Sequence, residues 1–329
     1  MSFDLDLVMR EQLVVRRKRV AAALSSARPD PELTALLQEV DAALERFESG
    51  TYGLCEVCHD TVEAARLIAN PLERFCLDHL NAKERSALED DLNLASQIQR
   101  GLLPGHDLHA DGWHFEYFYE PAGLVSGDYV DIIQTPGADV YFAVGDVSGK
   151  GVAASMLMAK LHAVFRSLIP LGLRVDQLTE RASRLFGEGM LPGQYATLIC
   201  GHASTDGEVA ICNAGHPSAL LCRGDRIEPI SATGLPLGMF PGQKFSVETT
   251  KLGGGDSLLL YTDGVPDALN SREEEYGMSR LMDVASASRS LVPDKFLAHC
   301  LSDLQLFRQG TSRFDDITMM GIRREARPV

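Results

Sequence analysis

The chain has 329 residues, enough for two domains or for one domain with additional segments. Its composition, 45% hydrophobic and 23% charged, is that of a soluble globular protein. A formal net charge of −15 argues against nonspecific nucleic-acid binding, because neutralising phosphates requires clustered Lys and Arg. No segment has the roughly 18 uninterrupted apolar residues of a membrane span, and residues 1–20 mix charged with apolar residues, unlike a signal peptide. We therefore expect a cytoplasmic protein with no membrane or direct nucleic-acid partner, and with four buried, reduced cysteines: Cys200, Cys212, Cys222 and Cys300.

The N-terminal part predicts two helices, over residues 4–24 and 32–48, separated by helix-breaking residues at 25–31. A short connection between two helices favours an antiparallel hairpin, so residues 1–49 form the predicted helical hairpin. The basic run Arg16-Arg17-Lys18-Arg19 is either a contact for an acidic partner or a solvated helix face. The second helix carries an apolar stripe at helical spacing: Leu33, Leu36, Leu37, Val40, Ala43, Leu44 and Phe47.

Four potential zinc ligands come after the hairpin: Cys55, Cys58, Cys76 and His79. Their spacing is Cys-x2-Cys, seventeen residues, then Cys-x2-His. Two such pairs on separate turns suit the tetrahedral preference of zinc, and a closed set of four ligands is typical of a structural site. The run Cys-x2-Cys-His also matches a haem-attachment pattern, but that chemistry requires export, which nothing in the sequence supports. We predict one structural zinc ion.

This stretch resembles the zinc finger of the DksA/TraR family. The resemblance rests on residues 50–55 (Gly-Thr-Tyr-Gly-Leu-Cys), residues 66–71 (Arg-Leu-Ile-Ala-Asn-Pro) and Cys76. It implies a zinc finger over residues 50–80, with His79 where the family usually has Cys. It also raises a contact between the N-terminal module and RNA polymerase or another regulator. Members of that family reach into the polymerase on a long coiled-coil hairpin, whereas the hairpin here is short.

One continuous helix is predicted from Leu80 to Leu103, ended by Pro104-Gly105, and residues 81–104 form the linker between the zinc module and the C-terminal domain. Its apolar residues recur near every seventh position. Two interpretations remain open: a homodimer seam through residues 81–104, or an amphipathic helix packed on the C-terminal domain of the same chain. The stripe consists of Leu88, Leu92, Ala95, Ile98 and Leu102.

From residue 108 to 324 the chain alternates strands with pairs of helices. The fold class that we expect is α+β, with two antiparallel β-sheets sandwiched between helices. One strand carries the alternating aromatics at positions 113, 115, 117 and 119, and Asp206-Gly207 marks a hairpin turn. Further strands are expected near 129–134, 138–146, 195–203, 208–213, 218–222, 244–252, 256–262 and 316–323, and helices at 152–168, 175–188, 278–288 and 294–308.

The chemistry centres on residues 140–151, where an apolar strand ends at Asp146 and a glycine-rich turn comes next. Asp128, Asp263 and Asp315 also lie beside glycines or at the edges of strand-like runs. Carboxylates at strand ends are the ligands that magnesium and manganese prefer. A phosphate loop around Lys150 is excluded by its glycine spacing and by the absence of Ser or Thr after the lysine. Two-metal hydrolysis remains, with Asp146 as the central bridging aspartate.

Residues 94–323 resemble the metal-dependent (PPM-type) serine/threonine phosphatases, in the bacterial branch of SpoIIE and RsbU. By this resemblance, Asp146 bridges two Mn²⁺ or Mg²⁺ ions, and the Val147 carbonyl and Asp128 complete the shell of one ion. Asp263 and Asp315 hold the other ion, with Asp316 as an alternative last ligand. Seven motifs carry the resemblance, at residues 98–104, 125–131, 145–151, 213–217, 234–238, 261–265 and 313–318.

The resemblance implies a protein-serine/threonine phosphatase acting on a phosphoprotein, typically a phosphorylated anti-sigma-factor antagonist in a partner-switching pathway. The alternative is a noncatalytic transcription regulator that binds RNA polymerase through the zinc module. No phosphate-holding arginine lies between Trp113 and Asp128, so substrate binding would rest on the metals. His216 is expected to stabilise a turn. Asp131 and Asp267 are either outer-shell groups or solvated.

Overall fold

The computed structural model describes residues 3–26, 30–80, 82–311 and 315–326. The predicted turn residues 27–29 and the motif residues Arg313 and Phe314 lie outside the described residues. The chain divides into two compact units, Met1–Asp90 and Asp91–Val329, and the division falls inside one helix, α4 (Ala82–Leu102). The two units are described separately.

The first unit contains α1 (Phe3–Ser26) and α2 (Pro31–Glu48), which pack against each other around Leu13, Val40 and Ala43. Asp30 caps α2, because its Oδ1 accepts hydrogen bonds from the backbone N–H groups of Glu32 and Leu33. The two predicted N-terminal helices are thus confirmed. Two short helices were not predicted: α3 (Ala64–Ala69) and the 3₁₀ helix η1 (Leu77–His79).

The second unit contains two antiparallel sheets. One sheet has the strand order β1-β2-β11-β10-β7-β8 and the other β3-β4-β5-β6-β9. The strands of the first sheet are β1 (Asp107–Ala110), β2 (Trp113–Glu120), β11 (Ile317–Arg324), β10 (Ser257–Tyr261), β7 (Ala219–Arg223) and β8 (Arg226–Ile230). Those of the second are β3 (Asp128–Gln134), β4 (Val140–Val147), β5 (Ala196–Ala203), β6 (Glu208–Ala214) and β9 (Glu248–Lys251).

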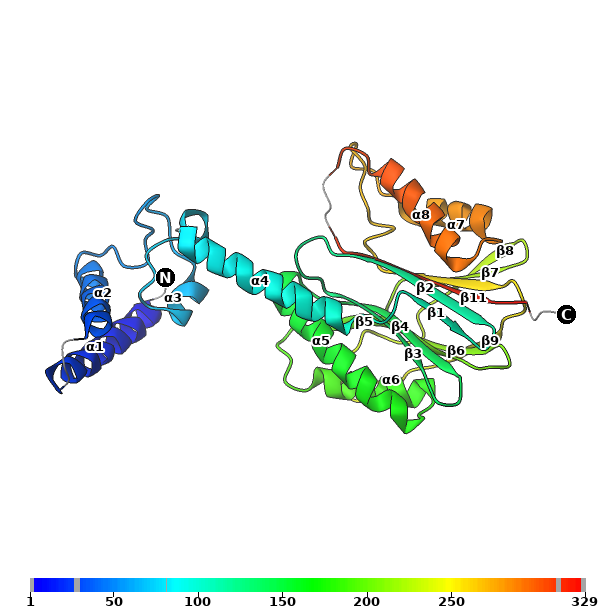
Figure 1. The fold of residues 1–329 in the computed structure, drawn as a ribbon, viewed down its shortest axis with the longest axis horizontal. Helices are drawn as coiled ribbons and strands as arrows, with labels where there is room; N and C mark the ends of the chain where they lie inside the picture. Colours follow the sequence, from blue (N-terminus) through cyan, green and yellow to red (C-terminus); the bar gives the residue numbers. More distant parts are fainter. Residues whose placement is uncertain (1–2, 27–29, 81, 312–314, 327–329) are drawn as a thin grey trace. The chain divides into compact units, whose positions relative to one another are not determined.

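Helices cover the outer face of each sheet, as Figure 1 shows. The second sheet is covered by α5 (Gly151–Leu168), which leads into η2 (Ile169–Leu171), and by α6 (Val175–Gly187); the first sheet is covered by α7 (Gly277–Ser288) and α8 (Pro293–Phe307). The inner faces of both sheets share one core that includes Trp113, Phe115 and Phe142. The predicted fold, two sheets sandwiched between helices, is confirmed.

Three strands of the structure differ from the prediction, and all three lie at sheet edges. Strands β1 and β8 were not predicted, and the strand expected over 244–252 is limited to Glu248–Lys251. The residues of β8 include two charged side chains and Pro229, and the residues of β9 are almost all exposed. Edge strands tolerate charge and proline because one side of the strand pairs with no neighbour. Their sequences therefore lack the apolar alternation by which the inner strands were recognised.

The stripe predicted on α4 faces inward only in part. Leu92, Ala95 and Leu102 are half-buried, but Ile98 is 60% exposed and Leu88 43% exposed. The buried positions near the C-terminal end of the helix are polar, namely Ser96 and Gln99.

Among the described residues, one segment, Gly151–Leu171, is long and apolar enough to cross a membrane by length and composition alone. It consists of α5 and η2. Met158, Leu161 and Phe165 from this segment pack into the core between the helices and the second sheet. Core helices of folded domains pass the same test, so the segment is weak evidence for a membrane span.

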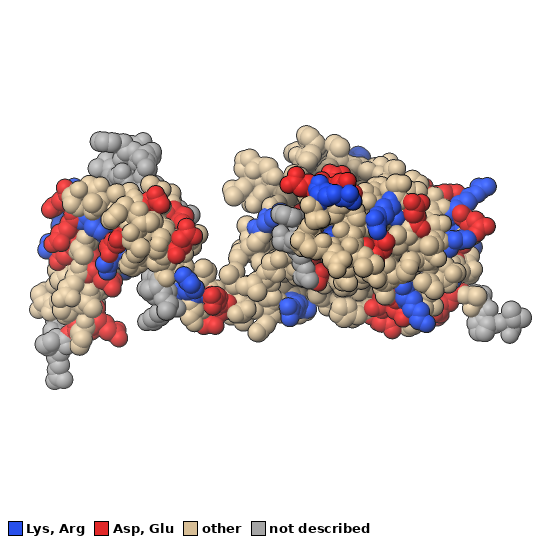
Figure 2. Space-filling view, turned by 90° about the horizontal axis from the view of Figure 1, so that it is seen from above, with Lys and Arg blue, Asp and Glu red and all other residues tan. Residues whose placement is uncertain are grey.

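On the face of the molecule shown in Figure 2, Lys and Arg side chains are interspersed with Asp and Glu. Positive charge on that face is not gathered into one large patch, in keeping with the formal net charge of −15.

Candidate metal centre

The four aspartates singled out in the sequence come together where the two sheets of the second unit meet. Asp128 begins β3 and lies opposite Asp146 of β4 in the strand register. Asp263 comes just after the end of β10, and Asp315 precedes the start of β11. Strands β10 and β11 are neighbours in the other sheet. Each sheet therefore contributes two of the four carboxylates.

Two threonine hydroxyls from the first sheet hold Asp128. Thr262 Oγ1 donates to Asp128 Oδ2 at 2.9 Å, and Thr318 Oγ1 donates to the same oxygen at 2.5 Å. All three side chains are buried. The threonines are also linked, because the Thr318 N–H donates to Thr262 Oγ1 at 3.1 Å. Sequence reasoning did not assign either threonine, although each lies next to or near a predicted aspartate.

The aspartates accumulate negative charge in a partly buried place. Burial, and then the charges of Asp263 and Asp315, raise the pKa of Asp146 to about 7. Burial and then the charge of Asp315 raise the pKa of Asp263, and burial with the charge of Asp146 raises the pKa of Asp128 well above its usual range. Like charges at close range disfavour ionisation, and a bound cation removes that penalty. The electrostatics of the cluster therefore favour divalent cations.

Two glycines leave room for the cluster to form. A Cβ atom on Gly127 would lie 3.1 Å from the Val147 carbonyl oxygen and 3.2 Å from Asp146 Oδ1. A Cβ atom on Gly264 would lie 1.9 Å from the carbonyl oxygen of Asp316. A side chain at either position would displace these oxygens. Because the donors in the cluster are carboxylate and carbonyl oxygens, the residues fit a hard cation such as Mg²⁺ or Mn²⁺.

Asp315 and Asp316 have different surroundings. Asp316 Oδ1 accepts a hydrogen bond from the backbone N–H of Ala122 at 2.7 Å, and its Oδ2 accepts one from the N–H of Gly127 at 2.9 Å. The carboxylate of Asp315 is half exposed and forms an ion pair with Lys150 at 3.0 Å. Asp316 thus fastens the loop before Asp128, while Asp315 faces the cluster.

A small cavity of about 110 Å³ adjoins the aspartates. Its lining includes Asp315, Asp267 and two cations, Lys150 and Arg308. Once a phosphate loop is excluded, Lys150 has no predicted role, and no sequence signal marks Arg308, which comes after the end of α8. Both cations line the space where an anionic group next to the aspartates would lie.

The aspartates do not form the closed shell of a single ion. Among the described residues, no three of these carboxylates each place an oxygen within 4.8 Å of the others. Asp128 and Asp146 belong to one sheet, and Asp263 and Asp315 adjoin strands of the other.

The loop that carries Asp128 is also tied to α4. Gln99 Nε2 donates to the carbonyl oxygen of Ser126 at 2.7 Å, and the N–H of Ser126 donates to Gln99 Oε1 at 3.0 Å. Ser126 Oγ in turn accepts the N–H of Asp128 at 3.0 Å. The last turns of α4 therefore contact a residue only two positions from a predicted metal ligand.

His216 is buried within the turn that begins at Asn213. Its backbone N–H donates to Asn213 Oδ1 at 2.8 Å, and its Nδ1 lies 2.9 Å from Thr197 Oγ1. Burial lowers its pKa to about 3, so the ring is neutral at physiological pH. These contacts describe a side chain that holds a turn in place, in accord with the expected role.

Asp131 is buried, and its carboxylate forms an ion pair with Arg166 of α5, a helix that covers the second sheet. Arg166 of α5 donates two hydrogen bonds to its carboxylate, at 2.8 and 2.5 Å, and Tyr129 Oη donates a third at 3.2 Å. Asp131 therefore anchors α5 on β3 and is turned away from the aspartate cluster.

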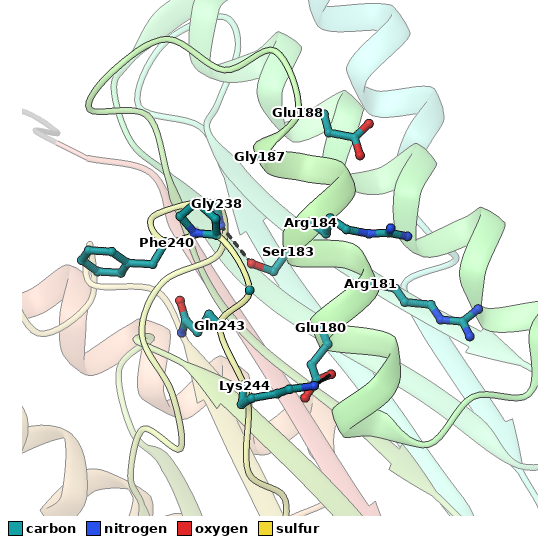
Figure 3. Close-up of a pocket in the computed structure, with 12 residues that line it drawn as sticks. Glu180, Arg181, Ser183, Arg184, Gly187, Glu188, Gly238, Phe240, Gln243 and Lys244 are labelled. Atoms are coloured by element: carbon teal, nitrogen blue, oxygen red, sulfur yellow. Dashed lines mark hydrogen bonds and ion pairs between the residues drawn. The ribbon is translucent and has the colours of Figure 1, made fainter.

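A separate hollow of about 520 Å³ lies between α6 and the loop that comes after the Gly234–Gly238 motif. Figure 3 shows Phe240 and Gln243 on the loop, and Gly238, whose N–H donates to Ser183 Oγ of α6 at 3.2 Å. None of the four aspartates lines this hollow, although it is larger than the cavity beside them. The hollow is therefore separate from the aspartates.

The predicted zinc ligands come together in the first unit. One ligand atom from each of Cys55, Cys58, Cys76 and His79 lies within 4.8 Å of the others. Cys58 Sγ is 3.7 Å from Cys76 Sγ, and Cys76 Sγ is 3.2 Å from His79 Nδ1. Zinc–sulfur bonds of about 2.3 Å at tetrahedral angles place two sulfurs about 3.8 Å apart. The cluster therefore has the donor set and spacing of a zinc site.

Comparison with protein families gives two matches. Residues 136–325 match the family described as Stage II sporulation protein E (SpoIIE), and residues 50–78 match the prokaryotic dksA/traR C4-type zinc finger. The fourth zinc-ligand candidate, His79, lies just beyond the second match and is a histidine where that description expects a cysteine.

Individual relatives match more than two thirds of the chain. IcfG of Synechocystis sp. is 27% identical over 263 residues, which are 71% of this chain and 41% of IcfG. Phosphoserine phosphatase RsbU of Bacillus subtilis is 23% identical over 243 residues, 72% of this chain and 71% of RsbU. The chain thus spans less than half the length of IcfG.

Solved structures agree with the fold. The RsbU and RsbW domains of a Mycobacterium tuberculosis protein superpose with a TM-score of 0.59 and 29% identity, covering 69% of this chain and 64% of that one. The PP2C domain of SiaA from Pseudomonas aeruginosa gives a TM-score of 0.65 at 19% identity, covering 74% and 99% of the two chains. Since the SpoIIE match extends over more than half of the sequence and over most of the two-sheet unit, this chain belongs to the SpoIIE family.

Proposed function

We propose that the second unit is a metal-dependent protein-serine/threonine phosphatase. The observation that carries this proposal is the set of four aspartates, two from each sheet, in which burial and neighbouring negative charge raise the pKa values of Asp128, Asp146 and Asp263. Phosphoryl transfer to water needs positive charge next to the phosphoryl oxygens, and a carboxylate cluster at a surface cavity is a means of holding it. The name of the relative RsbU, a phosphoserine phosphatase, supports the same activity.

Asp146 would bridge two Mn²⁺ or Mg²⁺ ions, with Asp128 and the Val147 carbonyl on one side and Asp263 and Asp315 on the other. Bound ions of this kind supply positive charge to the phosphoryl group and make water more acidic. Thr262 and Thr318 orient Asp128 through the hydroxyl hydrogen bonds to its Oδ2.

Lys150 and Arg308 would receive the phosphoryl oxygens, since both line the cavity beside Asp315. Lys150 forms an ion pair with Asp315, so its ammonium group lies at the cluster and need move little to face a phosphate. This would supply the cationic phosphate contact that the sequence before Asp128 lacks.

Substitution at the bridging position tests the proposal. Asp146→Asn should abolish manganese-dependent hydrolysis of a phosphoprotein and of a small aryl phosphate, because the substitution removes a charge that holds the ions. Asp283→Asn is the matched control, because Asp283 is exposed on α7. Circular dichroism of both variants should equal that of wild type. Retention of wild-type activity by Asp146→Asn would place the reaction elsewhere.

The substrate that we propose is a phosphorylated anti-sigma-factor antagonist of a partner-switching pathway. Support comes from relatives named phosphoserine phosphatase RsbU and RsbP. Incubation with candidate antagonists phosphorylated on serine, with phosphate release as the readout, identifies the substrate.

For the first unit we propose one structural zinc ion held by Cys55, Cys58, Cys76 and His79. We further propose the division that the sequence indicates: hairpin 1–49, zinc finger 50–80, linker helix 81–104 and phosphatase domain 108–324, in a cytoplasmic protein. Replacing Cys55 and Cys58 with serine should remove about one zinc per chain, as measured by elemental analysis. Cys222→Ser, a buried cysteine of β7, should leave the zinc content unchanged.

A noncatalytic regulator that binds RNA polymerase through the zinc module is the weaker alternative. The full aspartate set and its cationic neighbours have no use in such a protein. An interaction of the module with polymerase or another regulator remains compatible with phosphatase activity, and co-purification of polymerase with the Asp146→Asn variant would reveal it.

A further inference from the structure

A further group of side chains with metal-ligand donor atoms lies on the β1–β2 hairpin. Asp107 and His109 come from β1 and His114 from β2, and His109 lies directly opposite His114 in the register. Because side chains alternate along a strand, Asp107 and His109 share one face of the hairpin, and His114 faces the same way. Three residues with nitrogen or oxygen donors thus meet on one surface.

The donor atoms have the spacing of ligands to a single ion. Asp107 Oδ1 is 3.0 Å from His114 Nε2 and 3.5 Å from His109 Nε2. One ligand atom from each of the three residues lies within 4.8 Å of the others. Two donors bound at about 2.0–2.1 Å with tetrahedral angles are separated by about 3.3 Å. The two imidazoles are stacked with their centroids 4.0 Å apart, and the exposed His109 ring has room to turn toward a shared ion.

A fourth residue orients one of these ligands. Glu325, the residue after β11, places Oε1 3.3 Å from His109 Nδ1. A carboxylate that accepts the Nδ1–H of an imidazole leaves the lone pair of Nε2 for a metal, and this is the arrangement found around most metal-bound histidines. In His109, Nε2 is the nitrogen next to Asp107.

Further carboxylates surround the imidazoles. The side chain of His114 is buried, and its Nε2 lies 3.0 Å from Asp107 Oδ1. Glu116 faces the same surface, opposite Asp107. The hairpin therefore presents two imidazoles among several carboxylates.

We propose that Asp107, His109 and His114 form a third metal site, for a borderline divalent cation such as Zn²⁺ or Ni²⁺, with Glu325 as the orienting carboxylate. Imidazole nitrogens suit these ions, whereas the oxygen-only aspartate cluster suits Mg²⁺ and Mn²⁺. The site is distinct from the aspartate cluster. Strand β11 begins next to Asp315 and ends at Arg324, which lies opposite Trp113. The two sites are therefore at opposite ends of a strand of eight residues, which is about 25 Å long.

An ion at this site would join edge strand β1 to β2 and to the segment after β11. Strand β1 has only four residues and pairs with one neighbour, so it is the least supported strand of the sheet. The site would hold that edge in place without contacting the aspartates.

The fluorescence of Trp113 can report Ni²⁺ binding at the hairpin. It is the single tryptophan of the chain and directly precedes His114. Ni²⁺ bound at the hairpin should quench its fluorescence, whereas Ni²⁺ at a distant site should not. The protein is used full length, without a polyhistidine tag, with its zinc retained and Mg²⁺ at saturation to occupy the aspartate cluster. Wild type should show saturable quenching, with one more Ni²⁺ bound per chain by equilibrium dialysis than the variant His109→Ala.

Two further variants sharpen the test. Glu325→Gln should weaken Ni²⁺ binding on the order of tenfold while preserving its stoichiometry, as loss of an orienting carboxylate does. His106→Ala should behave as wild type, because His106 is an exposed histidine nearby that stacks on Tyr117 and is outside the cluster. Asp107→Asn, at an exposed position, replaces His109→Ala if the latter fails to fold by circular dichroism. Equal quenching of wild type and both ligand variants, or no quenching of wild type at millimolar Ni²⁺, would show that the four residues form only a hydrogen-bonded network.

Discussion

The side-chain amide of Gln99 pairs with the backbone of Ser126 through two hydrogen bonds, of 2.7 and 3.0 Å, and both residues are buried. An amide that satisfies both the N–H and the C=O of one residue fixes the position of that residue more firmly than a single bond does. The residue so fixed is two positions from Asp128. Rotation or displacement of α4 therefore moves the loop that presents a proposed metal ligand.

Gln99→Met should lower both stability and metal affinity. It leaves two buried backbone groups of Ser126 without partners, at a cost of about 1–3 kcal/mol. The unfolding midpoint monitored by Trp113 fluorescence should fall, and the Mn²⁺ concentration for half-maximal hydrolysis should rise. Gln97→Met, at an exposed position on the same helix, should change neither quantity. If hydrolysis by the Gln99→Met variant had an unchanged dependence on Mn²⁺ concentration, α4 would not influence the metal affinity of the aspartates.

Asp315→Asn and Asp316→Asn should have different effects. Asp315→Asn should abolish hydrolysis with little change in stability, since the carboxylate of Asp315 is half exposed and faces the cluster. Asp316→Asn should lower the unfolding midpoint as well, because the Asp316 carboxylate accepts the N–H groups of Ala122 and Gly127. Activity and thermal unfolding of the two variants are compared side by side. Loss of activity without loss of stability in Asp316→Asn alone would make Asp316 the last ligand.

The stability of the second unit without added divalent ions should fall as pH rises. The pKa of Asp146 is raised from 3.8 to about 7, so the folded state binds a proton more tightly than the unfolded state does. Stabilisation by that proton is complete below about pH 4 and is lost as pH rises through about 7, a change on the order of a few kcal/mol. Trp113 lies in the core of this unit, so its fluorescence reports on that unit specifically.

Unfolding midpoints measured between about pH 5 and pH 8 test this expectation. Mn²⁺ should raise the midpoint strongly at pH 8 and weakly at pH 5, because protons and metal compete for the same carboxylates. Asp146→Asn should flatten the pH dependence. A midpoint that rises with pH in wild type would contradict the assigned direction of the shift.

The exposed face of α4 should carry a homodimer contact. Leu94 and Ile98 are 55% and 60% exposed and lie one helical turn apart. Replacing both with glutamate should reduce the sedimentation coefficient to that of a monomer and alter hydrolysis at saturating Mn²⁺. The variant Asn93→Glu with Gln97→Glu adds the same charge at neighbouring exposed positions and should remain as wild type. If the variant with glutamate at both Leu94 and Ile98 kept the mass and activity of wild type, α4 would only connect the two units.

The sequence was sufficient to predict the elements with a regular apolar pattern and the aspartates next to apolar strands. Asp128, Asp146, Asp263 and Asp315 were recognisable because each ends or precedes a buried strand, and the structure brings them together. The inward face of α4 was not recognisable, because its buried positions are Ser96 and Gln99, and hydrophobic periodicity does not register a polar side chain paired with backbone.

Residues whose role depends on contact between distant segments also escaped prediction. Arg308 comes after a helix with nothing in its neighbours to distinguish it, and only folding places it in the cavity with Lys150 and Asp315. The hydroxyls of Thr262 and Thr318 belong to sequences separated by more than fifty residues and meet on the carboxylate of a third segment. Strand β1 is short and polar, so its pairing with β2 was set by the hairpin and not by an apolar pattern.

The division of the aspartates between two sheets has a consequence for ion selectivity. Asp128 and Asp146 belong to one sheet, and Asp263 and Asp315 adjoin strands of the other, so the spacing of the carboxylates depends on how the two sheets pack on the core between them. Magnesium tolerates little departure from octahedral bonds of about 2.0–2.1 Å. If the carboxylates hold the proposed ions, core side chains such as Val130, Phe142 and Met320, which are not part of the cluster, would help to set the spacing that an ion meets. A substitution that changes the volume of this core would then alter the preference for manganese or magnesium without replacing a carboxylate.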